Sequence, residues 1–234
     1  AERLNVGDDT SQGEPLSTYR KVISRRMSES ARTTAPVTLT TEADATALIA
    51  LRRQVTAELE GSDTSPPSVT DMLVRLTALA LTQHTDLNAS IDGDRLIVHG
   101  DVHIGVAVDS PRGLLVPVVR DAHRRSVFEI AEDSRALIAQ ARTGSIAVEH
   151  TQGGTFTVSN LGMFGIDAFT PIINLPECAV LGVGRIASRP VVVDEETEEI
   201  AVRKMMALSL TFDHRLVDGA PAARFLQLLV RMIE

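Results

Sequence analysis

The stretch with the clearest chemical content lies near the carboxyl end, at residues 208–219. There the apolar run LSLTF leads into DHRLVDG, in which His214 precedes Asp218 by four residues. A histidine at a strand end faces a cleft, and an imidazole with one free nitrogen can act as a general base near neutral pH. Asp218 can brace the turn or pair with an arginine. From these residues alone, a polar strand–helix turn is the alternative to a catalytic site.

Other reaction types lack the residues that they need. The six histidines show no HExxH or similar spacing, so the sequence predicts no metal site. No GxSxG elbow of the usual hydrolases occurs. The segment GVGRIA at 182–187 has two glycines of a dinucleotide fingerprint but lacks the third, and we interpret it as a tight strand end. Cys178, the single cysteine, stands beside an apolar run and is interpreted as a buried packing residue.

Composition limits the classes of partner. The chain of 234 residues carries a net charge of -8 and has 3% aromatic residues, so neither a basic face for nucleic acid nor base stacking is expected. No apolar run reaches the ~18 residues of a membrane span. No signal peptide is visible, and one cysteine is compatible with a reducing, cytoplasmic setting. The length suits one large domain or two small ones.

Periodicity predicts the elements that must position His214. Helices are expected over about 17–32, 45–60, from 68, from 126 and over 220–233, the third and fourth opened by Ser-x-x-Asp/Glu capping boxes. Strands are expected at 36–44, around a hairpin turn at 92–93, as a strand–turn–strand over 103–119, and at 153–162, 177–186, 189–193 and 202–213. Residues 1–15 read as a linker remnant or disordered end. Helices early and late with strands between them indicate an α+β fold with a mixed sheet.

Four segments, in order, resemble the catalytic domain of the dihydrolipoamide acyltransferases, the core components of 2-oxo acid dehydrogenase complexes. They are LSTYRKVISRRM, HIGVAVDSPRGLLVPVVRDA, the block from GGTFTVSNLG to LGVGRI, and DHRLVDGA. The HxxxDG pattern also occurs in chloramphenicol acetyltransferase, which shares the fold. The resemblance covers residues 16–234, which would form one acyltransferase catalytic domain. It implies a chloramphenicol-acetyltransferase-like two-layer sandwich, a mixed sheet flanked by helices.

The resemblance implies a reaction and roles for four residues. An acyl group passes between dihydrolipoamide and coenzyme A, and His214 matches the base that takes the thiol proton. Ser159 matches the hydroxyl that stabilises the tetrahedral oxyanion. Asp218 matches the aspartate of the motif, and Arg20 matches the arginine expected to pair with it as a structural support. The SNLGMFG and FTPIIN stretches favour an acetyl or branched-chain acyl group over succinyl.

The resemblance also implies an assembly. Three copies would form a homotrimer with active sites between subunits, built into a 24-mer or 60-mer core that works with decarboxylase and dihydrolipoamide dehydrogenase components. The lipoyl group would be carried on a domain absent from these residues, which we take as a sign of truncation. Two rivals remain at this point: an acyltransferase for another small acceptor, and a catalytically silent structural core or binding scaffold.

His103 stands where relatives often carry asparagine. It could alter the lipoamide channel, but we favour a solvated histidine at a strand end.

Overall fold

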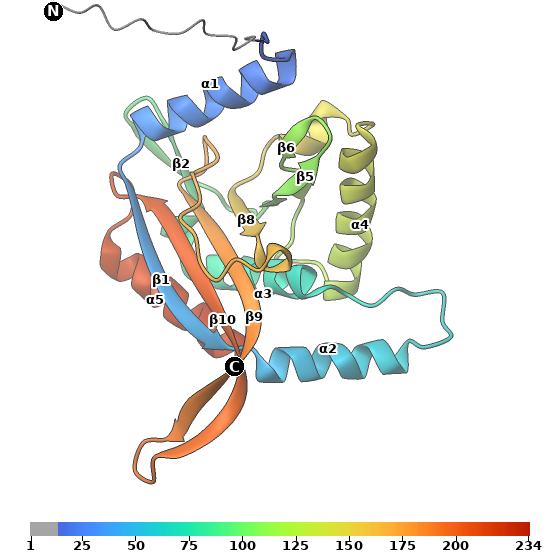
Figure 1. Cartoon of the computed structure of the whole chain (residues 1–234). Coiled ribbons are helices and arrows are strands. Elements are labelled where there is room, and N and C mark those ends of the chain that lie inside the picture. Colours follow the sequence, from blue (N-terminus) through green and yellow to red (C-terminus); the bar gives the residue numbers. More distant parts are fainter. Residues whose placement is uncertain (1–13) are drawn as a thin grey trace, which may run out of the picture.

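The computed structural model describes residues 14–234, so the predicted linker lies almost wholly outside the described residues. This part has five α-helices and ten strands (Figure 1). The helices are α1 (Thr18–Thr33), α2 (Thr46–Glu58), α3 (Val69–Gln83), α4 (Val127–Thr143) and α5 (Gly219–Ile233). The strands are β1 (Pro36–Asp44), β2 (Ala89–Asp92), β3 (Arg95–Val98), β4 (Ile104–Val106), β5 (Val108–Ser110), β6 (Gly113–Leu115), β7 (Val118–Val119), β8 (Phe156–Asn160), β9 (Ala179–Asp194) and β10 (Glu199–Asp213).

One sheet of six strands carries the fold, in the order β1-β10-β9-β8-β4-β7. Strand β8 runs parallel to both of its neighbours, β4 and β9, and the other pairs are antiparallel. The sheet is therefore mixed, which confirms the α+β class. Two separate hairpins, β2–β3 and β5–β6, lie beside it.

Local capping chemistry sets where the helices begin. Ser17 accepts a hydrogen bond from the third residue of α1, and Ser68 and Ser126 open α3 and α4 with complete capping boxes. Gly144 ends α4 in the left-handed conformation that glycine adopts without a steric cost. The predicted helices are confirmed with ends shifted by one or two residues. None of the described helices combines the length and the apolar character that crossing a bilayer requires.

The two faces of the sheet differ in chemistry because side chains alternate along each strand. One face carries mainly leucine and valine side chains and packs against α3 and α5. On this side the rings of Phe156 and Phe225 are 5.9 Å apart. The opposite face is polar: Thr38 and Thr211 hydroxyls lie 2.7 Å apart, and those of Thr40 and Ser209 lie 3.2 Å apart. Helices therefore cover one face of the sheet, and its polar face is left for other segments.

Three strand predictions differ from the structure. The expected strands at 177–186 and 189–193 are one strand, β9, which forms with β10 the long hairpin that projects from the body in Figure 1. The β2–β3 turn lies at 93–94, one residue later than predicted, because Asp92 still pairs with Arg95 and Gly93 takes the positive φ of 57°. The predicted strand–turn–strand divides: β5 and β6 form the hairpin, whereas β4 and β7 join the main sheet.

Candidate active site

His214 lies immediately after the last residue of β10. Its backbone N–H donates to the Ala35 carbonyl oxygen over 2.9 Å, which fixes the end of β10 beside the start of β1. The side chain is 45% exposed, its ring centroid lies 5.8 Å from that of Phe212, and Nδ1 lies 3.8 Å from an Asp218 carboxylate oxygen. The imidazole is thus accessible at a strand end, with an acceptor on its Nδ1 side, as a general base requires.

Asp213 supports this turn, a role that the sequence reasoning missed. Its carboxylate, 2% exposed, accepts hydrogen bonds from the backbone N–H groups of Ala35 and Arg215 and from the Arg215 guanidinium. Burial alone would raise the pKa of Asp213, but the hydrogen bonds from Arg215 and the two N–H groups outweigh it and hold the pKa below its ordinary value. The carboxylate therefore fixes the backbone on both sides of His214.

Asp218 and Arg20 are not brought together in this chain. Asp218 occupies the N-cap position of α5 with its side chain 84% exposed, and its side chain makes no capping hydrogen bond. Arg20 lies on α1, where its guanidinium stands next to Gly113 of β6. Within residues 14–234 the structure shows no ion pair between the two. Asp218 instead has a carboxylate oxygen 3.8 Å from Nδ1 of His214, which places it beside the imidazole.

Ser159 lies near the end of β8, on the polar face of the sheet. It lines a cavity of about 640 Å³ between β8, α4 and the start of α3. The next residue, Asn160, ties this strand end to its surroundings: its side-chain N–H donates to the Thr70 hydroxyl over 3.0 Å, and its carbonyl oxygen accepts from the Gly162 N–H over 2.8 Å. The serine hydroxyl is therefore presented to a cavity from an anchored strand.

The sheet register places Ser159 and His214 far apart within one chain. Ser159 pairs with Gly182, and Gly182 pairs with Ser209 two strands away. His214 follows Ser209 by five residues, which corresponds to about 17 Å along the strand, and two strand spacings add about 10 Å across it. A single copy therefore does not hold the two side chains around one reacting atom.

The segment 161–178, between β8 and β9, crosses the polar face of the sheet. A Cβ on Gly182 would stand 3.1 Å from the Phe169 ring, and one on Gly184 would stand 1.7 Å from the Asp167 carbonyl oxygen. The two glycines of GVGRIA thus leave room for the chain's own loop. They lie inside β9, so the interpretation of GVGRIA as a strand end was wrong.

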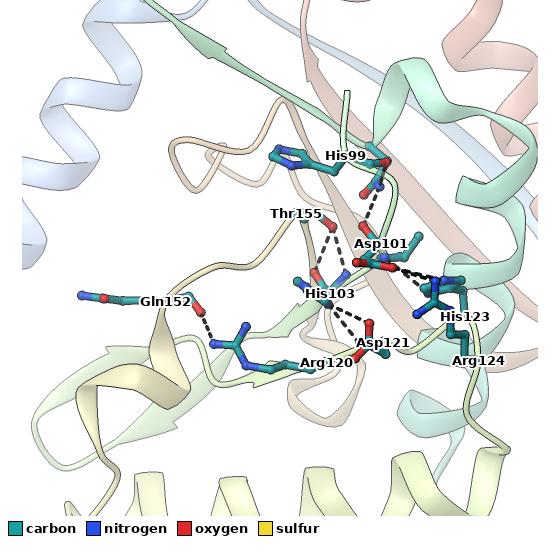
Figure 2. A network of polar contacts seen from close by, with 11 residues as sticks. His99, Asp101, His103, Arg120, Asp121, His123, Arg124, Gln152 and Thr155 are labelled. Atoms are coloured by element: carbon teal, nitrogen blue, oxygen red, sulfur yellow. Dashed lines mark hydrogen bonds and ion pairs between the residues drawn. The ribbon is translucent and has the colours of Figure 1, made fainter. Parts of the chain in front are cut away.

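His103 belongs to a polar network that joins the start of β4 to the segment after β7 (Figure 2). Its Nδ1 accepts the Asp121 backbone N–H over 3.0 Å, and its own backbone N–H donates to the Thr155 hydroxyl over 3.0 Å. In the same network Nδ1 of His123 accepts the Val102 N–H over 3.3 Å. The His103 side chain is 19% exposed, so the interpretation as a solvated histidine was wrong. Its ring links two segments at the edge of the sheet.

Cys178 is a free, buried thiol, which confirms its interpretation as a packing residue. Burial raises its pKa to about 12, so the sulfur stays protonated at neutral pH. A thiol in that state is neither a nucleophile nor a metal ligand.

Comparison with known proteins gives these observations a family context. Residues 8–234 match the family described as 2-oxoacid dehydrogenases acyltransferase (catalytic domain), and the chain belongs to this family. It is 40% identical over 229 residues to the acetyltransferase component of the acetoin cleaving system of Bacillus subtilis, which covers 98% of this chain and 57% of that protein. The chain spans about half the length of the curated relatives it matches.

Two further relatives act, by their names, on other acyl groups. The succinyltransferase component of the 2-oxoglutarate dehydrogenase complex of Haemophilus influenzae is 36% identical over 220 residues, covering 94% of this chain and 53% of that protein. The lipoamide acyltransferase component of the branched-chain alpha-keto acid dehydrogenase complex of Pseudomonas putida is 38% identical over 222 residues, with 94% and 52% covered.

Solved structures agree with this assignment. A dihydrolipoamide acetyltransferase of Azotobacter vinelandii, described with the roles of a serine, a histidine and an asparagine in its catalytic mechanism, matches with a TM-score of 0.90 and 34% identity, covering 100% of this chain and 96% of that one. The cubic core of the pyruvate dehydrogenase multienzyme complex matches with a TM-score of 0.90 and 33% identity, covering 100% and 96%. Chloramphenicol acetyltransferase, at 0.55 and 13% identity with 94% and 96% covered, shares the fold, as expected.

Proposed function

We propose that this chain transfers an acyl group between the thiols of dihydrolipoamide and coenzyme A, with His214 as the general base. The observation that carries the proposal is the accessible imidazole of His214 at the end of β10, with Asp218 beside Nδ1. A thiol with a pKa near 8.5 is only partly ionised at neutral pH, so a neighbouring base increases the attacking thiolate. The imidazolium then returns the proton to the sulfur that leaves.

Ser159 would stabilise the tetrahedral intermediate. Attack on a thioester places negative charge on the carbonyl oxygen, and a hydroxyl at the right distance from that oxygen can donate a hydrogen bond to it. In support, Ser159 faces a cavity from a strand end anchored through Asn160. The A. vinelandii relative is described with a serine, a histidine and an asparagine in its mechanism, and the latter two are four residues apart, as His214 and Asp218 are.

The proposed active site lies between two copies of the chain. The register separates His214 from Ser159 within one copy, so Ser159 of a second copy must face His214 of the first. We propose a homotrimer, built into a 24-mer or 60-mer core that cooperates with decarboxylase and dihydrolipoamide dehydrogenase components. The similarity to a structure described as a cubic core supports such an assembly. The lipoyl group that delivers the acyl unit would come from a separate domain.

We propose an acetyl or branched-chain acyl group. Relatives of similar identity include acetyl-, succinyl- and branched-chain acyltransferases, so their names do not distinguish the groups. Val106, Leu161 and Met163 line the cavity beside Ser159 with apolar side chains that suit an uncharged acyl chain, but Arg135 and Arg142 line it as well, so the choice between acyl groups rests on the sequence resemblance.

The test is a steady-state comparison of acetyl-, isobutyryl- and succinyl-coenzyme A with dihydrolipoamide as acceptor. We expect kcat/KM to be higher for acetyl or isobutyryl than for succinyl, and Ser159→Ala to lower kcat about 100-fold with little change in KM. Transfer to a different small acceptor alone, or no transfer in an assembled protein, would contradict the proposal. A succinyl preference would overturn only the choice of acyl group.

A further inference from the structure

Glu177 is a buried carboxyl group without a cationic partner. It is 3% exposed and follows the loop that crosses the polar face of the sheet. One oxygen accepts from the Thr157 hydroxyl over 2.6 Å, and the other accepts from the Asn174 side-chain N–H over 2.9 Å. The other strongly buried carboxylate discussed above, Asp213, has the Arg215 guanidinium as a partner. Among residues 14–234, no lysine, arginine or histidine forms an ion pair with Glu177.

Burial and hydrogen bonding define the state of this acid. A buried, unpaired charge is costly, so burial raises the pKa of Glu177 to about 8, while the hydrogen bonds from Thr157 and Asn174 and the charge of Arg26 act weakly in the opposite direction. In both contacts a carboxyl oxygen of Glu177 is the acceptor, from the Asn174 amide and from the Thr157 hydroxyl, and it is burial that favours the neutral form.

The contacts of Glu177 reach β8, the strand that carries Ser159. Thr157 and Ser159 alternate on β8, so both side chains project from its polar face. The crossing loop begins just after Ser159 and ends at Glu177, and Asn174 lies in its last part. Glu177 therefore joins the end of the loop to the strand two residues before the serine. Helix α1 holds the same loop from outside, because Ser30 donates to the Ile173 carbonyl oxygen over 2.7 Å.

We propose that Glu177, in its uncharged form, is a positioning residue that holds Ser159 in place by joining Thr157 to Asn174. Loss of its proton leaves an unpaired negative charge buried under the loop. The end of β8 then moves, and Ser159 no longer meets the developing oxyanion. The inference rests on the proposed role of Ser159 in acyl transfer.

The groups around Glu177 separate its titration from others. Arg26 of α1 donates to the Leu175 carbonyl oxygen over 3.3 Å. Cys178 follows Glu177 and ionises only near pH 12, and Asp86 contributes a negative charge near that cysteine. The backbone of Ser90 forms an isolated antiparallel β-bridge with Glu177, and its hydroxyl contacts the His99 ring. Burial and the nearby His103 lower the pKa of His99. None of these groups changes charge in the direction and range expected for Glu177.

The experiment measures kcat against pH in the assembled protein, for wild type, Glu177→Gln and the exposed control Glu132→Gln. Glutamine has the shape of the protonated acid and cannot ionise. We expect the ratio of kcat for Glu177→Gln to that for wild type to rise about tenfold between pH 7 and pH 9, with KM unchanged. The ratio of kcat for Glu132→Gln to that for wild type should stay constant with pH. Ionisation of the substrate thiol affects both proteins equally and cancels in such a ratio. A constant ratio for Glu177→Gln would overturn the proposal, even if its melting temperature changed.

A second set of variants separates failure of this inference from failure of the proposed function. Asn174→Ala removes the other end of the connection and should lower kcat at pH 7 several-fold. In a Ser159→Ala background, Asn174→Ala should lower kcat no further. The ratio of kcat with and without Glu177→Gln should also stay constant with pH in that background, because the residue through which both substitutions act is gone. If wild type shows no transfer, the proposed function fails, and if Ser159→Ala leaves kcat unchanged, the proposed role of Ser159 fails and the inference on Glu177 fails with it. If Ser159→Ala lowers kcat but the effects of the two substitutions simply add, only the positioning role of Glu177 fails.

Discussion

The backbone around His214 is held by its neighbours. The His214 N–H donates to the Ala35 carbonyl oxygen and follows the buried Asp213, whereas the imidazole lies near the Phe212 ring and the exposed Asp218. An accessible base whose backbone is fixed can reach a thiol and keep its orientation through the reaction. The residues around His214 therefore divide into those that hold the turn and those that face the substrate.

A first prediction concerns His214 as the general base. His214→Ala should lower kcat by several orders of magnitude, because it removes the proposed acceptor of the thiol proton, while coenzyme A affinity changes only a few-fold. Stopped-flow or steady-state transfer assays, together with calorimetric binding of coenzyme A, measure both quantities. Retention of more than a tenth of wild-type turnover would show that another group is the base.

A second prediction concerns Asp218. Because its carboxylate is 84% exposed and has no ion pair with Arg20 in this chain, Asp218→Asn should leave the melting temperature nearly unchanged. The asparagine can still accept a hydrogen bond, so kcat should fall modestly, whereas Asp218→Ala should fall further. Scanning calorimetry and transfer assays on the assembled protein test this. A large loss of stability in the asparagine variant would contradict this prediction. It would instead indicate that Asp218 pairs with Arg20 when the chains assemble.

Asp213 provides a third prediction, with a defined pH dependence. Its folded pKa is below the ordinary value of 3.8, so its charge stabilises the fold above that value and the stabilisation is lost as pH falls through the lower folded pKa. Asp213→Asn should cost about 1–3 kcal/mol at neutral pH, because it leaves buried donors poorly satisfied. The difference from wild type should shrink in acid. Urea unfolding at several pH values measures it, and a constant difference would contradict it.

At the scale of elements, the loop between β8 and β9 depends on the absence of side chains on β9. Gly184 lies where a Cβ would meet the Asp167 carbonyl oxygen, and Gly182 lies under the Phe169 ring. The loop then reaches Asn174 and Glu177, which bind the strand that carries Ser159. Packing of the loop on β9 and positioning of the serine are therefore connected.

Gly184→Ala tests this connection as a fourth prediction. The added methyl group overlaps backbone, so the loop must shift, and both the melting temperature and kcat should decrease. Gly100→Ala is the matched control, because nothing lies within 4 Å of its added Cβ and it should behave as wild type. Equal behaviour of the two variants would show that the loop adapts without consequence for Ser159.

The sequence predicted features that depend on neighbouring residues. The capping pairs Ser68–Asp71 and Ser126–Glu129 are local, so α3 and α4 begin where expected. The motif around His214 is local as well. Features made by distant segments were not predictable in this way: Asp213 acquires its role only when β1 docks on β10, and the ring of His103 acquires its hydrogen-bond partner from the segment at Asp121. The glycines of β9 acquire theirs from a loop that folds back across them.

At the scale of the whole molecule, the β9–β10 hairpin projects from the body of the chain (Figure 1). Val192 pairs with Ile200 on the hairpin, and both side chains are exposed, at 54% and 66%. Ser159 and His214 lie on different parts of the sheet. These features suit a chain that works beside copies of itself.

The fifth prediction follows from that arrangement. Inactive His214→Ala and inactive Ser159→Ala proteins, unfolded together and refolded as a mixture, should regain activity, because some interfaces then receive an intact histidine and an intact serine. Each variant refolded alone is the control and should stay inactive. If the mixture is as inactive as its components while an affinity tag on one variant co-purifies the other, both residues belong to a site within one chain.

The separation of Ser159 from His214 also has a genetic consequence. In the proposed ring each copy gives its histidine to one site and its serine to another, so a copy that lacks both residues inactivates two sites rather than one. A minor population of such chains, co-expressed with normal ones, would silence a larger share of the assembly than its own abundance. An allele of this kind would act dominantly, whereas an allele whose product fails to fold would be recessive.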